Sequence, residues 1–368
     1  MQDFLVLTYN WIINFIKMAQ EQAKVLREYF EADDQKKFYY EGIAGQGGQA
    51  TIYKIKFVKP GAAMSTARSL VVKVANPKRG SDVQGTLREK QILMELRGCK
   101  HIVRCIAGPN DPLEPAADER NWAWIYMDRI ENGTLTGFMV RAKQKGMVRL
   151  PNRVLWPIFL CLIRACIAMA WPRNAEDLNE STARTRGKAT GLAHNDIHGG
   201  NLLFGSYLDH PEHGRTPVLK LIDFGLAGRI HEDDDDEFGT GEQRNILDIG
   251  IMMASVIGLM TDRKYTGEEI EVDLSPLNCE KTVISPASNL LEDVDMGTPD
   301  PFPLVDRDVK LIAAACMASD PEERPSLAEL EAWVAERLLY DANKYGNKKF
   351  EQDENIRGIL QILIFDAF

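Results

Sequence analysis

The chain has 368 residues, 45% hydrophobic and 27% charged, enough for one two-lobed enzyme or for two or three domains of roughly 100–200 residues. This composition, with 28 Gly and 17 Pro, excludes collagen, a coiled coil and wholesale disorder. The 44 Lys and Arg against 54 Asp and Glu give a net charge of −10, which argues against electrostatic binding to nucleic acid or anionic lipid.

The six cysteines are scattered and form no CxxC pair, which favours a reduced intracellular chain over a disulfide scaffold. The most apolar N-terminal stretch, residues 4–18, is shorter than the ~20 residues that a membrane span needs. No basic segment precedes it, as one would in a signal peptide. We therefore expect a cytoplasmic or nuclear protein without membrane insertion.

The apolar pattern predicts a small β-rich part followed by a larger helical part. Residues 1–37 have mixed helical spacing, and residues 39–74 alternate as an antiparallel meander with strands at 51–57 and 70–74. A helix over 87–96 and strands over 102–106 and 122–127 follow. Beyond Asn132 the pattern becomes mainly helical, with a long apolar helix at about 153–171.

Three polar stretches are predicted to be loops: 172–190, 205–217 with its two His and two Pro, and the acidic run 232–237. The tail is polar from Tyr340 and strongly apolar over 359–368. We expect this tail to dock on the body of the protein or to bind a partner. The apolar N-terminal helix is suggested as its docking surface.

Three candidate sites lie in the β-rich part. Glycines in the run 45–54 (GQGGQATIYK) allow a tight turn whose amides can approach a phosphate, although such hairpins are usually plain turns. Lys73 lies among alternating apolar residues (LVVKV) and points either to solvent or into a cleft. Glu89 lies in a predicted helix, where a glutamate is normally on the surface.

Two further candidate sites lie in the helical part. The run 194–203 (HNDIHGGNLL) holds Asp196 and Asn201 five residues apart, with two glycines between them. The carboxylate can accept a proton from a hydroxyl, and the amide oxygen can bind a hard cation such as Mg²⁺. In the run 220–227 (KLIDFGLA), Asp223 follows an apolar strand and can add a second carboxylate to that cation.

All five segments, in this order and at these spacings, resemble the signature set of the eukaryotic-type protein kinases. The segments 127–135 (MDRIENGTL) and 320–326 (DPEERPS) are similar to the hinge and a late turn of the same family. The resemblance covers about residues 39–338. It implies an α+β, two-lobed protein kinase fold with an antiparallel N-lobe containing one main helix and a larger helical C-lobe. The expected parts are an N-terminal helical extension at 1–38, the N-lobe and hinge at 39–131, the C-lobe at 132–338 and a tail at 339–368.

The resemblance also implies ATP and Mg²⁺ as cofactors and a role for each matching residue. Lys73 would contact the α- and β-phosphates and pair with Glu89, Asn201 and Asp223 would bind Mg²⁺, and Asp196 would take the proton of the acceptor hydroxyl. The backbone covering the phosphates would be that of Gly45, Gln46, Gly47, Gly48 and Ala50. The adenine contacts would be Ile52, Val71 and Leu203, the backbone of Asp128 and Ile130, and the gatekeeper Met127. The apolar spine of the family would be formed by Leu93, His194 and Phe224.

Several residues depart from the family pattern. Asn195 replaces the Arg that normally grips a phosphate on the activation loop, and Thr240 is the only hydroxyl residue between Gly225 and Asn245, so switching by phosphorylation of this loop is not expected. His198 replaces a Lys that touches the γ-phosphate in protein kinases, and we count His198 among the catalytic residues.

Two assignments in the second half of the chain stay open. No APE sequence follows the DFG segment, so the usual glutamate partner of Arg324 is missing, and Glu237, Glu242 or another group could replace it. Either Asn245 or Asp248 could stand where the family has an Asp at the start of the next helix.

The function that these residues predict is an ATP-dependent protein kinase acting on Ser or Thr hydroxyls of a protein substrate. One alternative is a small-molecule phosphotransferase, because His198 is familiar from the aminoglycoside and choline kinase group. Another is a non-catalytic scaffold or nucleotide sensor with the kinase fold. A zinc site at His194-x-Asp196-x-His198 explains fewer of the residues.

Overall fold

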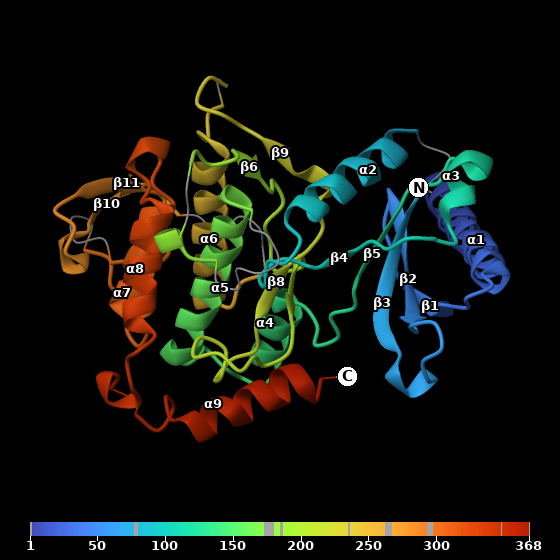
Figure 1. The fold of residues 1–368 in the computed structure, drawn as a ribbon. Coiled ribbons are helices and arrows are strands. Elements are labelled where there is room, and N and C mark those ends of the chain that lie inside the picture. Colours follow the sequence, from blue (N-terminus) through green and yellow to red (C-terminus); the bar gives the residue numbers. More distant parts are fainter. Residues whose placement is uncertain are drawn as a thin grey trace. The chain divides into compact units, whose positions relative to one another are not determined.

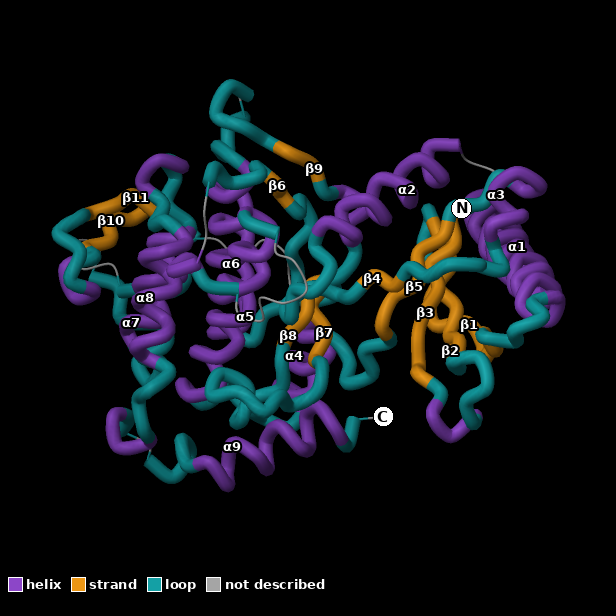
Figure 2. The backbone as a smooth tube through the Cα atoms, in the orientation of Figure 1, coloured by secondary structure: helices purple, strands orange, loops and turns teal. Residues whose placement is uncertain are grey.

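The computed structural model describes residues 2–76, 80–172, 180–184, 187–234, 236–261, 267–292, 297–346 and 348–367 (Figure 1). The chain forms two compact units. Unit 1 comprises Met1–Met94 and Arg104–Arg129, and unit 2 comprises Glu95–Val103 and Ile130–Phe368. The fold is α+β, with the main sheet in unit 1 and most of the helices in unit 2 (Figure 2).

Unit 1 is built on a five-stranded antiparallel sheet in the order β1-β2-β3-β5-β4. Its strands are β1 (Phe38–Gln46), β2 (Ala50–Phe57), β3 (Arg68–Ala75), β4 (Cys105–Ile106) and β5 (Trp124–Asp128). Its helices are α1 (Gln2–Ala32), α2 (Gly80–Glu95, with its last residue in unit 2) and α3 (Glu114–Arg120). The predicted N-terminal helix and antiparallel meander are therefore confirmed.

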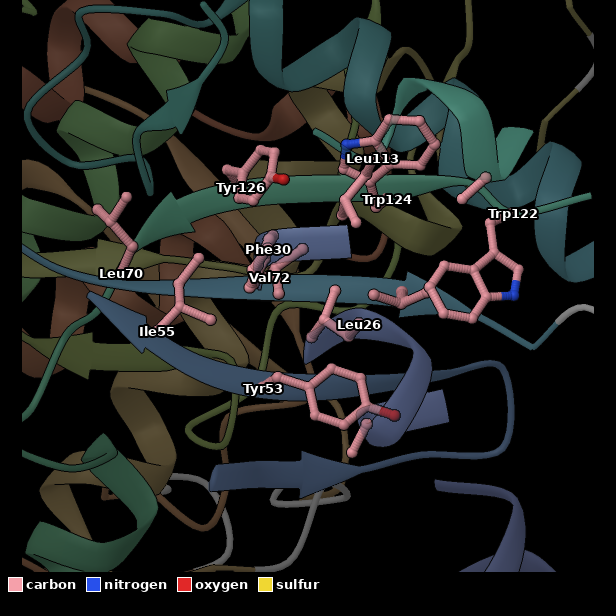
Figure 3. Packing of buried hydrophobic residues seen from close by; sticks show 13 residues of the cluster. Leu26, Phe30, Tyr53, Ile55, Leu70, Val72, Leu113, Trp122, Trp124 and Tyr126 are labelled. Atoms are coloured by element: carbon pink, nitrogen blue, oxygen red, sulfur yellow. The ribbon is translucent and has the colours of Figure 1, made fainter. Parts of the chain in front are cut away.

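One face of this sheet packs against α1. In β3, Leu70, Val72 and Val74 are fully buried and alternate with Val71 and Lys73 on the opposite face, as the two-residue period of a strand requires. Leu26 and Phe30 of α1 join the same cluster as aromatic and aliphatic residues of β2, β3 and β5 (Figure 3). Side-chain burial is described for α1 from Lys17 onward.

Hydrogen bonds fix α1 in place on this face. The Tyr53 hydroxyl lies 2.7 Å from Gln22 Oε1 and 3.0 Å from the Ala19 carbonyl oxygen, and Gln22 Nε2 donates to the Ala75 carbonyl at 3.0 Å. Because these polar groups are buried, their pairing avoids a penalty of about 1–3 kcal/mol each. The segment predicted as an N-terminal extension is thus an integral layer of unit 1.

Unit 2 is mainly helical. Its helices are α4 (Leu135–Gln144), α5 (Asn152–Ala170), α6 (Gly241–Ile257), α7 (Arg307–Cys316), α8 (Leu327–Arg337) and α9 (Asp353–Leu360), followed by a short π-helix at Gln361–Phe365. Three two-stranded sheets pair β6 (Leu192–Ala193) with β9 (Gly228–Arg229), β7 (Leu202–Phe204) with β8 (Leu219–Leu221), and β10 (Ile270–Asp273) with β11 (Thr282–Ser285). Helix α6 packs on α5 and α7, and α8 also packs on α5.

Helix α5 forms the centre of unit 2, as its apolar sequence predicts. Among the described residues, it is the one helix long and apolar enough to cross a membrane by length and composition. Every residue of α5 is buried within the protein, as in the core helix of a folded domain. The helix predicted over 87–96 is α2, which ends at Glu95 and begins at Gly80, seven residues earlier than predicted.

The structure also differs from the prediction at 102–106, at the strand predicted over 122–127, which is β5 (Trp124–Asp128), and at α3. The strand predicted over 102–106 is divided, because Ile102 and Val103 pair with Leu221 in unit 2 while Cys105 and Ile106 pair with β5 in unit 1. Helix α3 was not predicted, because its sequence EPAADER carries no apolar period.

The C-terminal tail docks on unit 2. Ile356, Leu360, Leu363 and Ile364 are buried, and Arg141 Nε of α4 donates to the Leu363 carbonyl at 2.7 Å. The expected docking is therefore confirmed with α4 as the partner, whereas the N-terminal helix had been suggested. The predicted loop at 205–217 contains no helix or strand. Parts of the predicted loops at 172–190 and 232–237 lie outside the described residues.

Candidate active site

The glycine-rich segment forms the β1–β2 hairpin of unit 1. Gly45 pairs with Ile52 and Gln46 with Thr51, and the Gly47 amide donates to the Ala50 carbonyl at 2.9 Å to close the turn. Gly47 and Gly48 are exposed, and a Cβ atom at Gly48 would meet nothing within 4 Å. The backbone of this turn is open to a ligand, which is what a phosphate contact requires.

Lys73 forms a buried ion pair with Glu89. Lys73 Nζ lies 2.7 Å from Glu89 Oε2, and the side chains are only 12% and 2% exposed. The strand β3 and the helix α2 bring together two residues that are sixteen positions apart. A glutamate on a helix is normally solvated, so this burial distinguishes Glu89 from the ordinary surface residue that its sequence alone allowed.

The residues predicted to contact adenine lie partly on the same face of the sheet as Lys73. Ile52 pairs directly with Lys73, and Val71 pairs directly with Met127, so each pair projects to one face. The Asp128 side chain pairs with Arg68, and the Asp128 amide donates to the Arg104 carbonyl at 3.1 Å, so the predicted adenine contact of this residue falls to its carbonyl oxygen. Ile130 and Leu203 belong to unit 2.

In unit 2, Asn245 of α6 holds the loop that carries Asp196. Asn245 Oδ1 accepts from the His194 amide at 3.0 Å, and Asn245 Nδ2 donates to the Leu192 carbonyl at 2.8 Å. Asn245 is 1% exposed. Of the two residues that the sequence left open, Asn245 therefore makes the bonds that anchor the loop, and Asp248 lines the pocket beside Asp196.

Three polar residues of this loop lie together. Asn201 Nδ2 donates to Asp196 Oδ2 and to the Asp196 carbonyl, both at 3.0 Å. His198 Nε2 lies 3.6 Å from Asp196 Oδ2. The nitrogen end of the Asn201 amide is thus occupied, and its oxygen end is the acceptor that a hard cation would use.

The loop and the DFG segment are tied together by main chain. The Ile222 amide donates to the Asn201 carbonyl at 2.9 Å, so Asp223 follows directly after a residue bonded to Asn201. Asp223 is exposed and has a left-handed backbone, with φ of 64°. A carboxylate and an amide oxygen at neighbouring positions form a donor set that suits Mg²⁺.

The ring of His194 packs against Phe224. Their centroids lie 4.6 Å apart in an edge-on arrangement, and His194 Nε2 lies 3.1 Å from the Ile222 carbonyl oxygen. Burial lowers the pKa of His194 to about 4, so its ring is neutral at pH 7. Two of the three residues predicted to form an apolar spine are therefore in contact, both within unit 2.

Arg324 binds carbonyl groups in place of a glutamate. Its Nη1 donates to the carbonyls of Phe238 at 2.8 Å and Gln243 at 3.1 Å, and its Nε donates to Ala318 at 3.0 Å. Of the alternatives considered for its partner, Arg324 therefore uses neither Glu237 nor Glu242 in these bonds. The bonds from Arg324 to the Phe238 and Gln243 carbonyls attach the start of α6 to the 320–326 turn.

Thr240 caps helix α6. The Thr240 amide donates to Gln243 Oε1 at 2.8 Å and the Thr240 hydroxyl accepts from the Gln243 amide, and these two bonds form a capping box.

We expect Thr240→Ala to lower the free energy of unfolding by about 1 kcal/mol. Asn195 has no charge with which to bind a phosphate, so the transfer rate per folded molecule should stay within about twofold. Unfolding curves would measure the free energy of unfolding and initial rates would measure transfer, with Thr240→Ser as the control. If the transfer rate of Thr240→Ala fell much further than its fraction of folded protein, the expectation would be wrong.

A pocket of about 480 Å³ lies beside Asp196 and His198, entirely within unit 2. Its wall is built from α4, the 195–200 loop and α6, with the side chains of Thr136, Met139, Asp248, Ile251 and Ser255 among the lining. The volume falls within the range of about 300–1,000 Å³ that is typical of small-molecule sites. An acceptor hydroxyl in this pocket can reach the carboxylate of Asp196.

Asp248 is a carboxylate of the pocket wall that the sequence named only as an alternative to Asn245, not as part of a site. Burial raises its pKa to about 6, and the nearby Asp196 carboxylate adds to the rise, while Arg244 and Arg324 oppose it. The spacing of three residues from Asn245 places both on one side of α6, toward the 194–201 loop. That spacing was the signal that could have identified Asp248.

The raised pKa of Asp248 predicts a pH-dependent stability effect. The native fold disfavours the ionised carboxylate, so Asp248 lowers stability above about pH 6, and this cost disappears below its ordinary pKa of 3.8. We expect Asp248→Asn to raise the free energy of unfolding by on the order of 2 kcal/mol at pH 7.5 and by much less at pH 4. Urea unfolding at both pH values would measure this, with the exposed Asp209→Asn as a matched control. An equal effect of Asp248→Asn at both pH values would show that Asp248 is not perturbed.

No protein-family model matches the chain, and no curated protein matches it. The class of protein is therefore inferred from the site itself. In unit 1 the fold joins Lys73 with Glu89, which lie sixteen positions apart, and in unit 2 it holds Asp196 beside Asn201 and His198 of the same loop.

Proposed function

We propose that the protein is an ATP-dependent kinase that transfers the γ-phosphate to Ser or Thr hydroxyls of a protein substrate. The observation that carries this proposal is the hydrogen-bonded pair of Asp196 and Asn201 beside a pocket of about 480 Å³. A fixed carboxylate at the edge of an open pocket is what a hydroxyl acceptor requires of a base. The two-lobed kinase fold is part of the same proposal.

The residues of unit 1 would bind the nucleotide phosphates. Lys73 carries the positive charge, and its 2.7 Å pair with Glu89 fixes the position of the ammonium group. The exposed turn at Gly47 and Gly48 offers backbone amides to phosphate oxygens. Ile52 and Val71, on the same face as Lys73, would contact the adenine ring.

The residues of unit 2 would orient the acceptor and hold the cation. Asn201 Oδ1 and the Asp223 carboxylate are oxygen donors of the type that Mg²⁺ prefers, and the bound cation would neutralise phosphate charge. Asp196 accepts the proton of the attacking hydroxyl, and its bond to Asn201 keeps the carboxylate from turning away. His198, 3.6 Å from Asp196 Oδ2, contributes a donor at the same point.

The same pocket favours a second candidate, a phosphotransferase for a small hydroxylated molecule. The pocket volume is typical of a site for a small ligand. At His198 the chain resembles the aminoglycoside and choline kinase group, whose acceptors are small molecules. Asp248 adds a second carboxylate to the pocket wall. In this candidate, Asp196 keeps the same chemical role and only the acceptor changes.

Transfer from labelled ATP tests both candidates. The purified chain would be incubated with labelled ATP and Mg²⁺, with generic protein substrates in one arm and hydroxylated small molecules in another. Label on protein that disappears in Asp196→Asn supports the protein kinase. Transfer only to small molecules supports the second candidate. Nucleotide binding without transfer in either arm contradicts both and indicates a non-catalytic scaffold.

A further inference from the structure

A second cluster of chemically reactive side chains lies inside unit 2, away from the candidate active site. It contains His101, Cys161 of α5, and His213 from the 205–217 loop. One potential ligand atom from each residue lies within 4.8 Å of those of the other two. All three side chains are at most 2% exposed. Three segments that are far apart in sequence thus bring two imidazoles and a thiol to one point.

The groups around this cluster orient its ligand atoms. His101 Nδ1 lies 3.1 Å from Glu180 Oε2, so His101 donates through Nδ1 and turns the lone pair of Nε2 toward the cluster. A carboxylate behind a histidine is the arrangement that commonly fixes metal-binding imidazoles. The Leu219 amide donates to Cys161 Sγ at 3.4 Å, which fixes the position of the sulfur.

The two imidazole rings face each other through their Nε2 atoms, as two ligands of one ion would. His101 Nε2 and His213 Nε2 lie 3.1 Å apart, so His213 must donate through Nε2. His213 Nδ1 is then a buried lone pair with no hydrogen-bond partner among the described residues.

We propose that His101, Cys161 and His213 bind one zinc ion, with Glu180 as the carboxylate that positions His101. Two neutral imidazoles and a thiolate are a ligand set typical of Zn²⁺. Cys161 releases its thiol proton on binding, so one proton leaves per ion. The remaining positive charge faces Glu180, which lies within hydrogen-bond distance of His101.

The size of the site indicates a structural role for the ion. The adjoining cavity, lined by His101, His210, Glu212 and His213 among others, has a volume of about 10 Å³. This is room for about one water molecule as a fourth ligand and not for a substrate. The zinc ion would fasten the 205–217 loop to α5 and to the segment of His101. This inference does not depend on the proposed phosphoryl transfer.

Metal binding by the full-length chain tests the site. The protein would be stripped with a chelator and titrated with zinc chloride in competition with a zinc indicator, and its metal content would be measured after gel filtration. We expect one zinc ion per chain, release of one proton and a higher melting temperature. Cobalt(II) in place of zinc should give a thiolate-to-metal charge-transfer band.

The variants separate this site from surface binding. Cys161→Ser and His213→Gln should abolish stoichiometric binding and the cobalt band, and Glu180→Gln should weaken binding by about 10–100-fold. Cys166→Ser removes another buried thiol from the same helix and should bind zinc normally. If Cys161→Ser fails to fold, His213→Gln still tests the site, because it changes a loop residue and not the central helix α5. No stoichiometric zinc in the wild type, or equal binding in Cys161→Ser and Cys166→Ser, would overturn the proposal and leave an ordinary histidine pair.

Discussion

Replacing Asp196 by asparagine should lower the rate of phosphoryl transfer by about 10²–10⁴-fold, the usual contribution of a general base. The substitution keeps the shape of the side chain, and the new amide oxygen can still accept from Asn201 Nδ2, as Asp196 Oδ2 does at 3.0 Å. What is lost is the negative charge that accepts the hydroxyl proton. Initial rates with labelled ATP at saturating acceptor would measure the effect, together with nucleotide affinity, which should change little.

The exposed Asp209→Asn is the matched control, because it makes the same chemical change on the surface of the same unit. It should leave the rate unchanged. A rate for Asp196→Asn within about threefold of wild type, well short of the loss expected for a base, would remove Asp196 from the catalytic role.

Replacing Lys73 by methionine should have two separate effects. Transfer should fall by at least about 100-fold, because a charge aimed at the phosphates is lost. The free energy of unfolding should fall by about 3–5 kcal/mol, because Glu89, only 2% exposed, is left as an uncompensated buried charge. Urea unfolding and transfer rates measured on the same preparation would report both.

Two further variants separate catalysis from stability. Lys73→Met combined with Glu89→Leu removes both charges and should restore most of the stability but none of the activity. Lys56→Met removes a lysine from the neighbouring strand β2, where Lys56 Nζ forms an exposed ion pair with Glu41 at 2.9 Å. This substitution should lower the free energy of unfolding by at most about 1 kcal/mol. Activity that returns in the double variant would show that Lys73 acts only through the fold.

Local patterns predicted those elements whose burial follows a simple period. The alternation in β3 separates the buried Leu70, Val72 and Val74 from Lys73, and the unbroken apolar run of α5 indicates a buried helix. Helix α3 was not predicted because its sequence has no apolar period. The helix is stabilised instead by its C-cap, where Asn121 adopts the left-handed region at φ of 52°.

Features that depend on distant partners could not be predicted from local sequence. The 102–106 run looks like one strand but divides because Leu221 pairs with its first half. The choice between Asn245 and Asp248 needed the bond from the His194 amide. The pocket beside Asp196 and the cluster around Cys161 each require three segments to meet, and such meetings depend on the tertiary fold.

The most direct test of the central claim is the equilibrium binding of ATP by calorimetry, with and without Mg²⁺. Wild type, Lys73→Met in unit 1 and Asp223→Asn in unit 2 would be compared. We predict one nucleotide per chain, with affinity lowered at least about tenfold by either substitution, because the proposed function assigns to each residue a charged contact with the same Mg²⁺–ATP. Asp223→Asn should also remove most of the effect of Mg²⁺. ATP binding that is absent, or that is insensitive to one of the two substitutions, would contradict the account.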